Sequence, residues 1–281
     1  MANWGKIGAR GKVDDRRGMT VPTGGIGIVG IGIVLAVMYF GGLDSGVEMM
    51  SVLQESNAPA AVTEQPTEFA GEDKYELFAS QVLGIGNIVW TGIAKEKDIL
   101  YREPTLVLFR GATQSACGGA SSASGPHYCP VDETIYLDET FFDEMSRRFG
   151  AKGGDVAEAY VIAHELGHHV QNVFGTMDQV RTAQRRSPHK SNALSIQQEL
   201  QADCFAGIWA HALRGRDIFE EGEIMEAMDA AESVGDDRIQ QKTSGQINPE
   251  SWTHGSSKER KEWFTRGYQS GDYSACNTYK K

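Results

Sequence analysis

The sequence predicts an α+β domain, mostly helical with a small sheet, preceded by one N-terminal transmembrane helix. Three observations predict this fold class. Two stretches in the middle of the chain have helical apolar spacing, short β-branched runs precede them, and residues 21–43 carry no charge. Residues 71–281 are numerous enough for a single domain with a sizeable core.

The first 43 residues have the composition of a membrane anchor and its flank. Residues 1–20 contain five basic residues and two acidic ones, and the uncharged run that follows is rich in Ile, Val and Gly. About 20 apolar residues can cross a bilayer as a helix, and basic residues favour the cytoplasmic side. We therefore expect a cytoplasmic basic tail over 1–20, a single inner-membrane anchor over 21–43 and an exported domain. A cleaved signal peptide is the alternative, but no small-x-small site follows directly.

Between the anchor and the centre of the chain, composition predicts a linker, a helix and two strands. Residues 44–70 mix Pro, Ala and Glu without a period and are typical of an extended linker. Residues 72–93 have a broad apolar stripe and are expected to form a helix. Residues 105–109 and 134–137 are short runs beside turn residues, as in strands.

The stretch from Asp155 to Gly175 reads as a helix that carries the motif H-E-x-x-H. Asp155 begins a capping box and Gly175 provides a stop. His164 and His168 are four residues apart, so both rings leave one face of the helix and can bind one metal ion. The alternative is a pair of ordinary surface or core histidines.

The residue types beside this histidine pair indicate a hydrolytic role. Glu165 lies next to the expected ion, where its carboxylate could take a proton from an activated water and return it to a leaving amine. His169 points about 100° away from His168 and is expected to be a neighbour of the site.

A second helix is expected from Ser195 to Gly215. It could supply the third protein ligand that a catalytic zinc needs beyond two histidines. Glu199 and Asp203 lie four residues apart on one face, opposite an apolar face. A solvated acidic face would have the same spacing. Small residues on that side favour close helix packing instead: Ala202, Ala206 and Gly207.

Four motifs together resemble the bacterial neutral zinc metallopeptidase family: H-E-L-G-H-H-V-Q, E-L-Q-A-D-C-F-A-G-I-W-A, T-H-G-S-S-K-E-R and S-G-D-Y-S-A-C. H-E-x-x-H followed by E-x-x-x-D on a later helix is also similar to the gluzincin peptidases. The resemblance implies a zincin-like fold and one Zn²⁺ per chain. Its ligands would be His164, His168 and Glu199, with Glu165 as the base and Asp203 orienting a metal histidine.

Four cysteines allow three pairings. The economical pairing joins Cys117 to Cys129 around a Gly- and Ser-rich loop, which is too flexible to hold a shape unaided, and Cys204 to Cys276. Disulfides require an oxidising compartment, so this expectation depends on export. A structural zinc site made of cysteines is the alternative, but C-x-x-C spacing is absent from the sequence.

Two further residues are candidates for the substrate cleft. Zincin-like folds place an antiparallel edge strand along the cleft, so the strand around Tyr136 is expected to bind an extended peptide; the same pattern also fits a purely structural strand. His254 precedes a helix capped by Ser256 and Glu259 and could stabilise the oxyanion. His127, His189 and His211 have no comparable support.

The sequence therefore predicts a membrane-anchored zinc endopeptidase that acts on a protein or peptide substrate. The alternative is a non-catalytic, zinc-stabilised binding domain in the periplasm, which would have no use for Glu165. A net charge of −11 argues against a nucleic-acid partner. No pattern in the residues indicates an oligomeric state.

Overall fold

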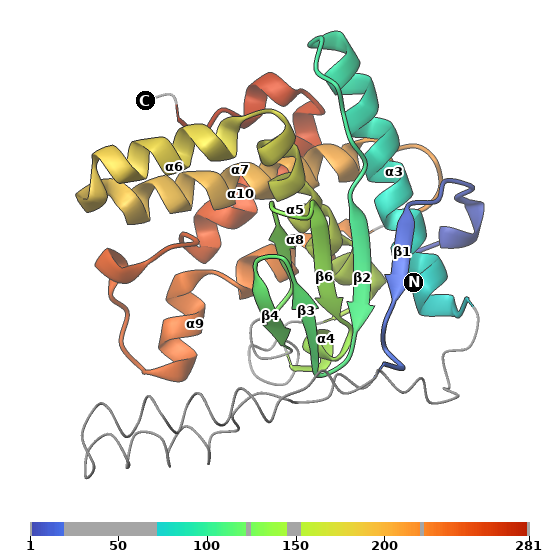
Figure 1. Cartoon of the computed structure of the whole chain (residues 1–281), viewed down its shortest axis with the longest axis horizontal. Helices are drawn as coiled ribbons and strands as arrows, with labels where there is room; N and C mark the ends of the chain where they lie inside the picture. Colours follow the sequence, from blue (N-terminus) through green and yellow to red (C-terminus); the bar gives the residue numbers. More distant parts are fainter. Residues whose placement is uncertain (1, 20–71, 122–124, 145–152, 220–221, 280–281) are drawn as a thin grey trace, which may run out of the picture. The chain divides into compact units, whose positions relative to one another are not determined.

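A four-stranded sheet and the helices packed on it form the core of the protein, shown as a computed structural model in Figure 1. The structure describes residues 2–19, 72–121, 125–144, 153–219 and 222–279. The expected anchor over 21–43 and the expected linker over 44–70 lie outside the described residues. The remainder is a mixed, mostly helical α+β fold with small sheets, as predicted.

The main sheet has the strand order β1-β2-β6-β5. Strands β1, β2 and β6 are parallel, and β5 pairs antiparallel with β6. A separate hairpin pairs β3 with β4. The strands are β1 Lys12–Asp15, β2 Thr105–Phe109, β3 Ala112–Ser115, β4 Gly118–Ser121, β5 His127–Cys129 and β6 Thr134–Asp138.

Helices α3 and α5 pack on the sheet, and α7 lies between α5 and α10. The α-helices are α3 Lys74–Glu96, α4 Thr140–Glu144, α5 Asp155–Val173, α6 Thr176–Arg186, α7 Ser191–His211, α8 Ile224–Ser233, α9 Asp236–Thr243 and α10 Ser257–Ser270. The short 3-10 helices are η1 Trp4–Lys6, η4 Pro188–Lys190, η5 Pro249–Ser251 and η6 Tyr273–Cys276.

The expected helices are present, but two of their N-termini differ from prediction. Helix α5 is capped by Gly154, and the Asp155 carboxylate accepts hydrogen bonds from Ala2 N and Trp4 Nε1 instead of capping the helix. Helix α7 begins at Ser191, four residues before the expected cap, so Glu199 lies well inside the helix. The predicted capping box of α10, Ser256 with Glu259, is confirmed.

Residues 2–17 belong to the folded domain, in contrast to the separate basic tail expected over 1–20. They form one compact unit with the chain from Gly71 onward. Strand β1 pairs in register with β2, from Lys12 beside Thr105 to Asp15 beside Leu108. The difference arises because the basic charges that suggested a tail are paired locally, Arg16 with Asp14 and Arg17 with Asp15.

Helix α3 is, among the described residues, long and apolar enough to cross a membrane. However, 67% of its most apolar stretch is buried inside the domain, where Val82, Leu83 and Trp90 are fully enclosed. Helix α3 is therefore a core helix of the domain.

Close helix crossings hold α7 in place. A side chain at Gly167 of α5 would come within 3.0 Å of the Ala202 backbone, and one at Gly207 would come within 2.1 Å of the Phe264 carbonyl of α10. The predicted small face of α7 thus allows contact on two sides.

The structure contains both expected disulfides. Cys117–Cys129 joins the end of the β3–β4 hairpin region to β5. The loop between these two cysteines was expected to have no shape unaided. Its described residues include strands β4 and β5. Cys204–Cys276 joins α7 to η6 near the C-terminus.

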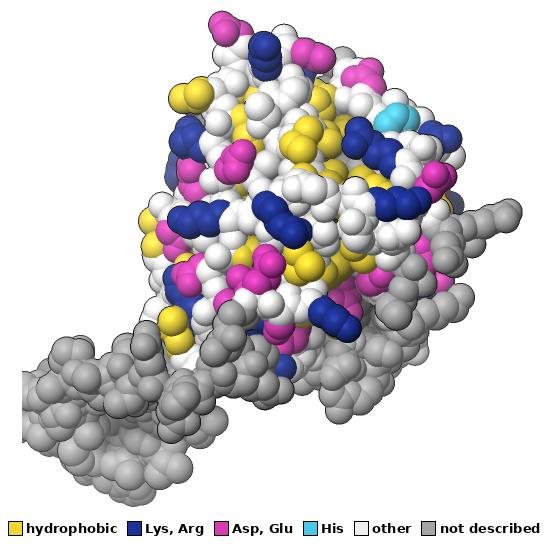
Figure 2. All heavy atoms as spheres, turned by 90° about the vertical axis from the view of Figure 1, so that its right-hand side faces the viewer, with side chains coloured by type: hydrophobic (Ala, Val, Ile, Leu, Met, Phe, Trp, Pro, Cys, Tyr) yellow, Lys and Arg dark blue, Asp and Glu magenta, His cyan; other side chains and the backbone are white. Residues whose placement is uncertain are grey.

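The face formed by α3 and β1 mixes apolar and charged side chains. Figure 2 shows Lys and Arg scattered between apolar patches and acidic groups on this face. The described part of this face therefore has no continuous basic surface.

Candidate metal centre

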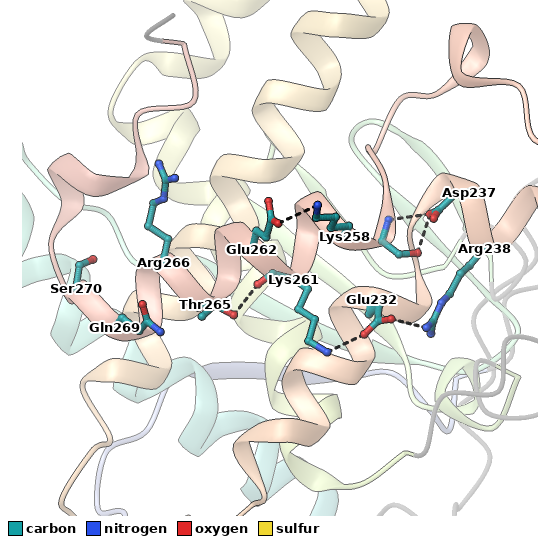
Figure 3. A pocket seen from close by; sticks show the side chains of 11 residues that line it. Glu232, Asp237, Arg238, Lys258, Lys261, Glu262, Thr265, Arg266, Gln269 and Ser270 are labelled. Carbon is teal, nitrogen blue, oxygen red and sulfur yellow. Dashed lines mark hydrogen bonds and ion pairs between the residues drawn. The ribbon is translucent and has the colours of Figure 1, made fainter.

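A surface hollow of about 1070 Å³ along α8, α9 and α10 is lined mainly by charged residues (Figure 3). Most of its charges are paired with one another. Lys261 Nζ lies 2.8 Å from Glu232 Oε2, Arg238 donates to the same Glu232, and Lys258 pairs with Glu262. Within each pair the two charges balance at the solvated surface, so these residues are not candidates for a reactive site.

The three expected metal ligands converge where α5 meets α7. One ligand atom from each of His164, His168 and Glu199 lies within 4.8 Å of the other two. His164 Nε2 is 3.2 Å from Glu199 Oε2, and His168 Nε2 is 3.4 Å from Glu199 Oε1. Two imidazoles and one carboxylate are a ligand set that zinc accepts, and they leave one position open in a tetrahedral site.

The far side of each imidazole is held by an acceptor. His164 Nδ1 donates to Asp203 Oδ1 at 2.8 Å, and His168 Nδ1 donates to Gln171 Oε1 at 2.9 Å. The Gln171 amide is oriented because its Nε2 donates to Gln198 O and Gln201 Oε1. Both rings therefore direct Nε2 toward Glu199, the orientation that metal-ligating histidines require.

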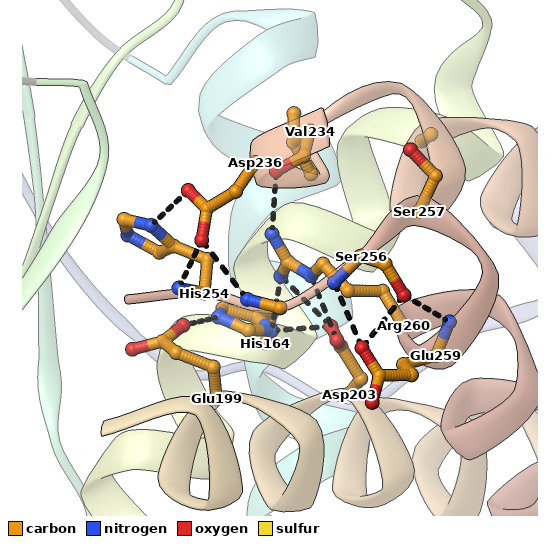
Figure 4. A network of polar contacts seen from close by, with 12 residues as sticks. His164, Glu199, Asp203, Val234, Asp236, His254, Ser256, Ser257, Glu259 and Arg260 are labelled. Carbon is orange, nitrogen blue, oxygen red and sulfur yellow. Dashed lines mark hydrogen bonds and ion pairs between the residues drawn. The ribbon is translucent and has the colours of Figure 1, made fainter. Parts of the chain in front are cut away.

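A buried ion pair supports the Asp203 carboxylate (Figure 4). Arg260 of α10 donates from Nε to Asp203 Oδ2 at 2.8 Å and from Nη2 to Oδ1 at 2.9 Å. The Tyr160 hydroxyl donates to Oδ1 at 2.6 Å. Burial alone would raise the pKa of Asp203, but the charges of Arg260 and His164 and their hydrogen bonds lower it to about 2. Asp203 is therefore a fixed anion behind His164.

The electrostatics of the three ligands fit a cation. Burial by itself would lower the pKa of His164, but Asp203 and Glu199 raise it to about 10. Burial would raise the pKa of Glu199, yet the two histidines hold it well below its usual range. His164, His168 and Glu199 together thus favour positive charge between their ligand atoms, and a divalent metal ion can take the place of the protons there.

Glu165 lies in the same cleft as these three residues. Its side chain is largely buried and lines the cleft. Within the described chain, no hydrogen bond or ion pair engages its carboxylate. Its carboxylate is therefore available to a water molecule or substrate.

The cleft has a volume of about 660 Å³ and includes His254 on its wall. His254 Nδ1 lies 3.2 Å from Asp236 Oδ1, and Asp236 Oδ2 accepts the backbone N–H groups of Thr253, His254 and Gly255. Half of the His254 side chain is exposed. His254 is therefore a half-exposed residue of the cleft wall that is held by Asp236 (Figure 4).

Tyr136 is not in the cleft, and its strand is not an edge. Strand β6 lies between β2 and β5, and Tyr136 is 3% exposed with its hydroxyl donating to Asp132. The antiparallel edge strand is β5, whose His127 and Tyr128 line the cleft. The error arose because β5 has only three residues and lies inside a Gly- and Ser-rich stretch, so it has no periodic signal.

His169 is a neighbour of the site, as expected. It lies near Tyr128 and Arg102, and burial lowers its pKa to about 4. His127 stacks on Tyr136 at 5.3 Å in the cleft wall, His211 bonds the Tyr268 carbonyl, and His189 lies in η4.

Sequence reasoning missed three supporting residues: Arg260, Gln171 and Asp236. Gln171 lies three residues after His168 on the same helical face, and this spacing could have indicated it. Arg260 and Asp236 lie far along the chain from their partners, and no local pattern marks them.

The family model described as "Putative neutral zinc metallopeptidase" matches residues 2–279. The chain belongs to this family. The match covers nearly the whole chain, so zinc-dependent peptidase chemistry is supported at the level of the family.

Relatives from two bacterial groups are similar over most of the chain. "Uncharacterized protein YpfJ" from Escherichia coli K12 is 38% identical over 94% of this chain and 90% of its own length. "Uncharacterized protein Rv2575" from Mycobacterium tuberculosis H37Rv is 42% identical over 74% of this chain and 73% of its own length. No solved structure matches significantly.

Proposed function

We propose that this protein is a zincin-like endopeptidase that hydrolyses peptide bonds at the His164, His168 and Glu199 centre. The observation that carries the proposal is the convergence of three metal donors beside an unengaged carboxylate, Glu165, in one cleft. The same donors without a base would suit a structural metal. With Glu165 beside them, they suit hydrolysis.

His164, His168 and Glu199 would hold one zinc ion, with Asp203 and Gln171 fixing the two rings. Zinc bound there would supply Lewis-acid chemistry, polarising the scissile carbonyl and lowering the pKa of a water molecule. Glu165 then accepts a proton from the attacking water and delivers it to the departing amine.

His254 would act on the negative charge that develops on the carbonyl oxygen. Asp236 accepts from Nδ1 of His254, and the doubly protonated imidazolium is the form of His254 whose Nε2–H could donate to the oxyanion. A donor in this position stabilises the oxyanion, and loss of one such donor costs about 10²–10³ in kcat.

The edge of β5 would bind the substrate as an extended chain. Strand addition uses main-chain hydrogen bonds, so it accepts many sequences. This supports an unfolded protein or a peptide as the substrate class. The excess of acidic residues gives no support to a nucleic-acid substrate.

The experiment compares the purified full-length protein, loaded with zinc in detergent, with its Glu165→Gln variant on a labelled unfolded protein. We expect chelator-sensitive cleavage that falls about 10²–10⁴-fold in the variant, because the base is lost. Zinc content should be unchanged. The exposed Glu262→Gln on α10 is the matched control and should cleave normally.

Equal cleavage by Glu165→Gln would refute the role of the base. Stoichiometric zinc without any cleavage by the parent protein would favour the non-catalytic binding domain.

A further inference from the structure

We infer that the N-terminus and the metal centre lie on the same side of the membrane. Residues 21–43 would then attach the protein to lipid from that side and would not form a single-pass anchor. This inference does not depend on peptidase activity. It rests on how the chain segments before and after residues 18–72 are joined in the folded domain.

The segment before this stretch is built into the core. Trp4 is 9% exposed and stacks on Trp209 of α7, with ring centroids 6.4 Å apart. The Gln81 amide of α3 donates to the carbonyls of Trp4 and Ile7 at 3.0 and 2.9 Å. These contacts bury Ala2, Trp4 and Ile7 against helices that come after the apolar run.

A close backbone crossing follows. Gly11 N donates to Ser80 O at 2.7 Å, and Ser80 Oγ donates back to Gly11 O at 2.8 Å. A side chain at Gly84 would come within 2.6 Å of the Arg10 backbone. Strand β1 then pairs with β2 along its full length. The N-terminal segment therefore completes the domain.

The two ends of the stretch meet at an ion pair. Arg17 Nη2 lies 2.9 Å from Asp73 Oδ2, and the Arg17 side chain is 2% exposed. Asp73 is also the N-cap of α3, where it accepts from the amides of Tyr75 and Glu76. The chain thus leaves the domain and returns to it at one place.

A single crossing would separate these ends by the bilayer. The hydrocarbon core is about 30 Å thick, whereas Arg17 and Asp73 are in contact. A second crossing by residues 44–72 is excluded by composition, because this stretch contains six acidic residues and no basic one. Each carboxylate at the centre of a bilayer costs about 2.5–3.5 kcal/mol.

The apolar run would contact lipid. Residues 21–43 are uncharged and dominated by Ile, Val, Leu and Gly, a composition that hydrocarbon favours. Entry and exit by one face satisfy both this composition and the Arg17–Asp73 contact. This inference replaces the expectation of a cytoplasmic tail and an exported domain on opposite sides.

Labelling of two variants of the full chain, each with one added cysteine, tests the inference. Gly8→Cys lies before the apolar run and Gly92→Cys lies after it; both positions are exposed, and a side chain there meets no atom within 4 Å. Intact and permeabilised spheroplasts are treated with a membrane-impermeant maleimide. The parent protein, whose four cysteines form two disulfides, sets the background.

We expect both variants to be labelled in intact spheroplasts, because disulfides favour an oxidising compartment. Labelling of both only after permeabilisation would also place the two ends on one side and support the inference. Labelling of one variant with protection of the other would overturn it.

A deletion of residues 21–43 tests the lipid contact separately. The full chain should sediment with membranes, and the deletion variant should move to the soluble fraction with its fold retained, because Arg17 and Asp73 still meet. A full chain found in the soluble fraction would overturn the attachment.

Discussion

Helix α7 takes part in two contacts that differ in how far apart their residues lie in the sequence. Toward α5 it presents Glu199 and Asp203, which lie four residues apart on one face of the helix. Toward the N-terminus it presents Trp209, which stacks on Trp4 across more than 200 residues of chain. The residues of the candidate metal centre are thus close in sequence within each helix, whereas the residues that support these helices are far apart in the sequence.

The largest expected effect comes from removing the long-range contact. A chain starting at residue 71 lacks β1 and Trp4 and should fail to fold cooperatively, whereas deletion of residues 21–43 should leave the domain folded. Trp4→Ala in the latter should lower the free energy of unfolding by about 3–5 kcal/mol, because a buried aromatic ring is lost. Urea unfolding followed by circular dichroism measures both. A cooperative transition for residues 71–281 equal to that of the deletion variant would break the comparison.

The second prediction concerns the buried support of the metal face. Arg260→Met leaves the Asp203 carboxylate buried without its cation and should cost about 3–5 kcal/mol in the free energy of unfolding. Arg266→Met on the same helix is the matched control, since Arg266 is exposed and should change stability by no more than about 1 kcal/mol. Equal stability of the two variants in urea would show that Arg260 is not the partner that Asp203 requires.

The metal face was largely predictable, and the reason is geometric. H-E-x-x-H and E-x-x-x-D each act within one helix, where spacing fixes the face on which a side chain lies. The two histidines therefore share a face with Glu165 beside them, whereas the position of Glu199 next to them followed from the family resemblance. The edge strand was misassigned to the strand of Tyr136, because three-residue β5 has no period and strand order depends on distant pairing.

The contacts that support the metal centre and the domain were not predictable, because they join residues that are far apart in the sequence. Asp155 looked like a helix cap, but it binds Ala2 and Trp4, which lie 153 and 151 residues away. The basic residues at the N-terminus looked like part of a separate tail, but Arg16 and Arg17 pair with neighbouring aspartates of strand β1, which belongs to the domain. Composition cannot distinguish a charged tail from a charged edge strand.

A smaller effect is expected at the junction of the N-terminal segment with α3. Burial would raise the pKa of Asp73, but the Glu76 amide and Arg17 lower it below its usual 3.8. A lowered folded pKa stabilises the protein above about pH 3.8, and this contribution is lost as pH falls through the folded pKa.

Asp73→Asn keeps a helix cap but removes the charge. It should reduce the free energy of unfolding near neutral pH by no more than about 1 kcal/mol and weaken its dependence on pH below about 5. Urea unfolding between pH 3 and 7 measures this dependence. A variant whose stability follows the parent's at every pH would show that the ion pair contributes nothing.

Equilibrium dialysis against a zinc series tests the assignment of the metal centre most directly. The parent protein should bind one zinc ion per chain, and Glu199→Ala should lose tight binding because one of three donors is gone. Asp203→Ala should bind about 10–100-fold more weakly yet fill at high zinc, because it only orients His164. Stoichiometric binding by Glu199→Ala, with complete loss in Asp203→Ala, would contradict the account and make Asp203 the third ligand.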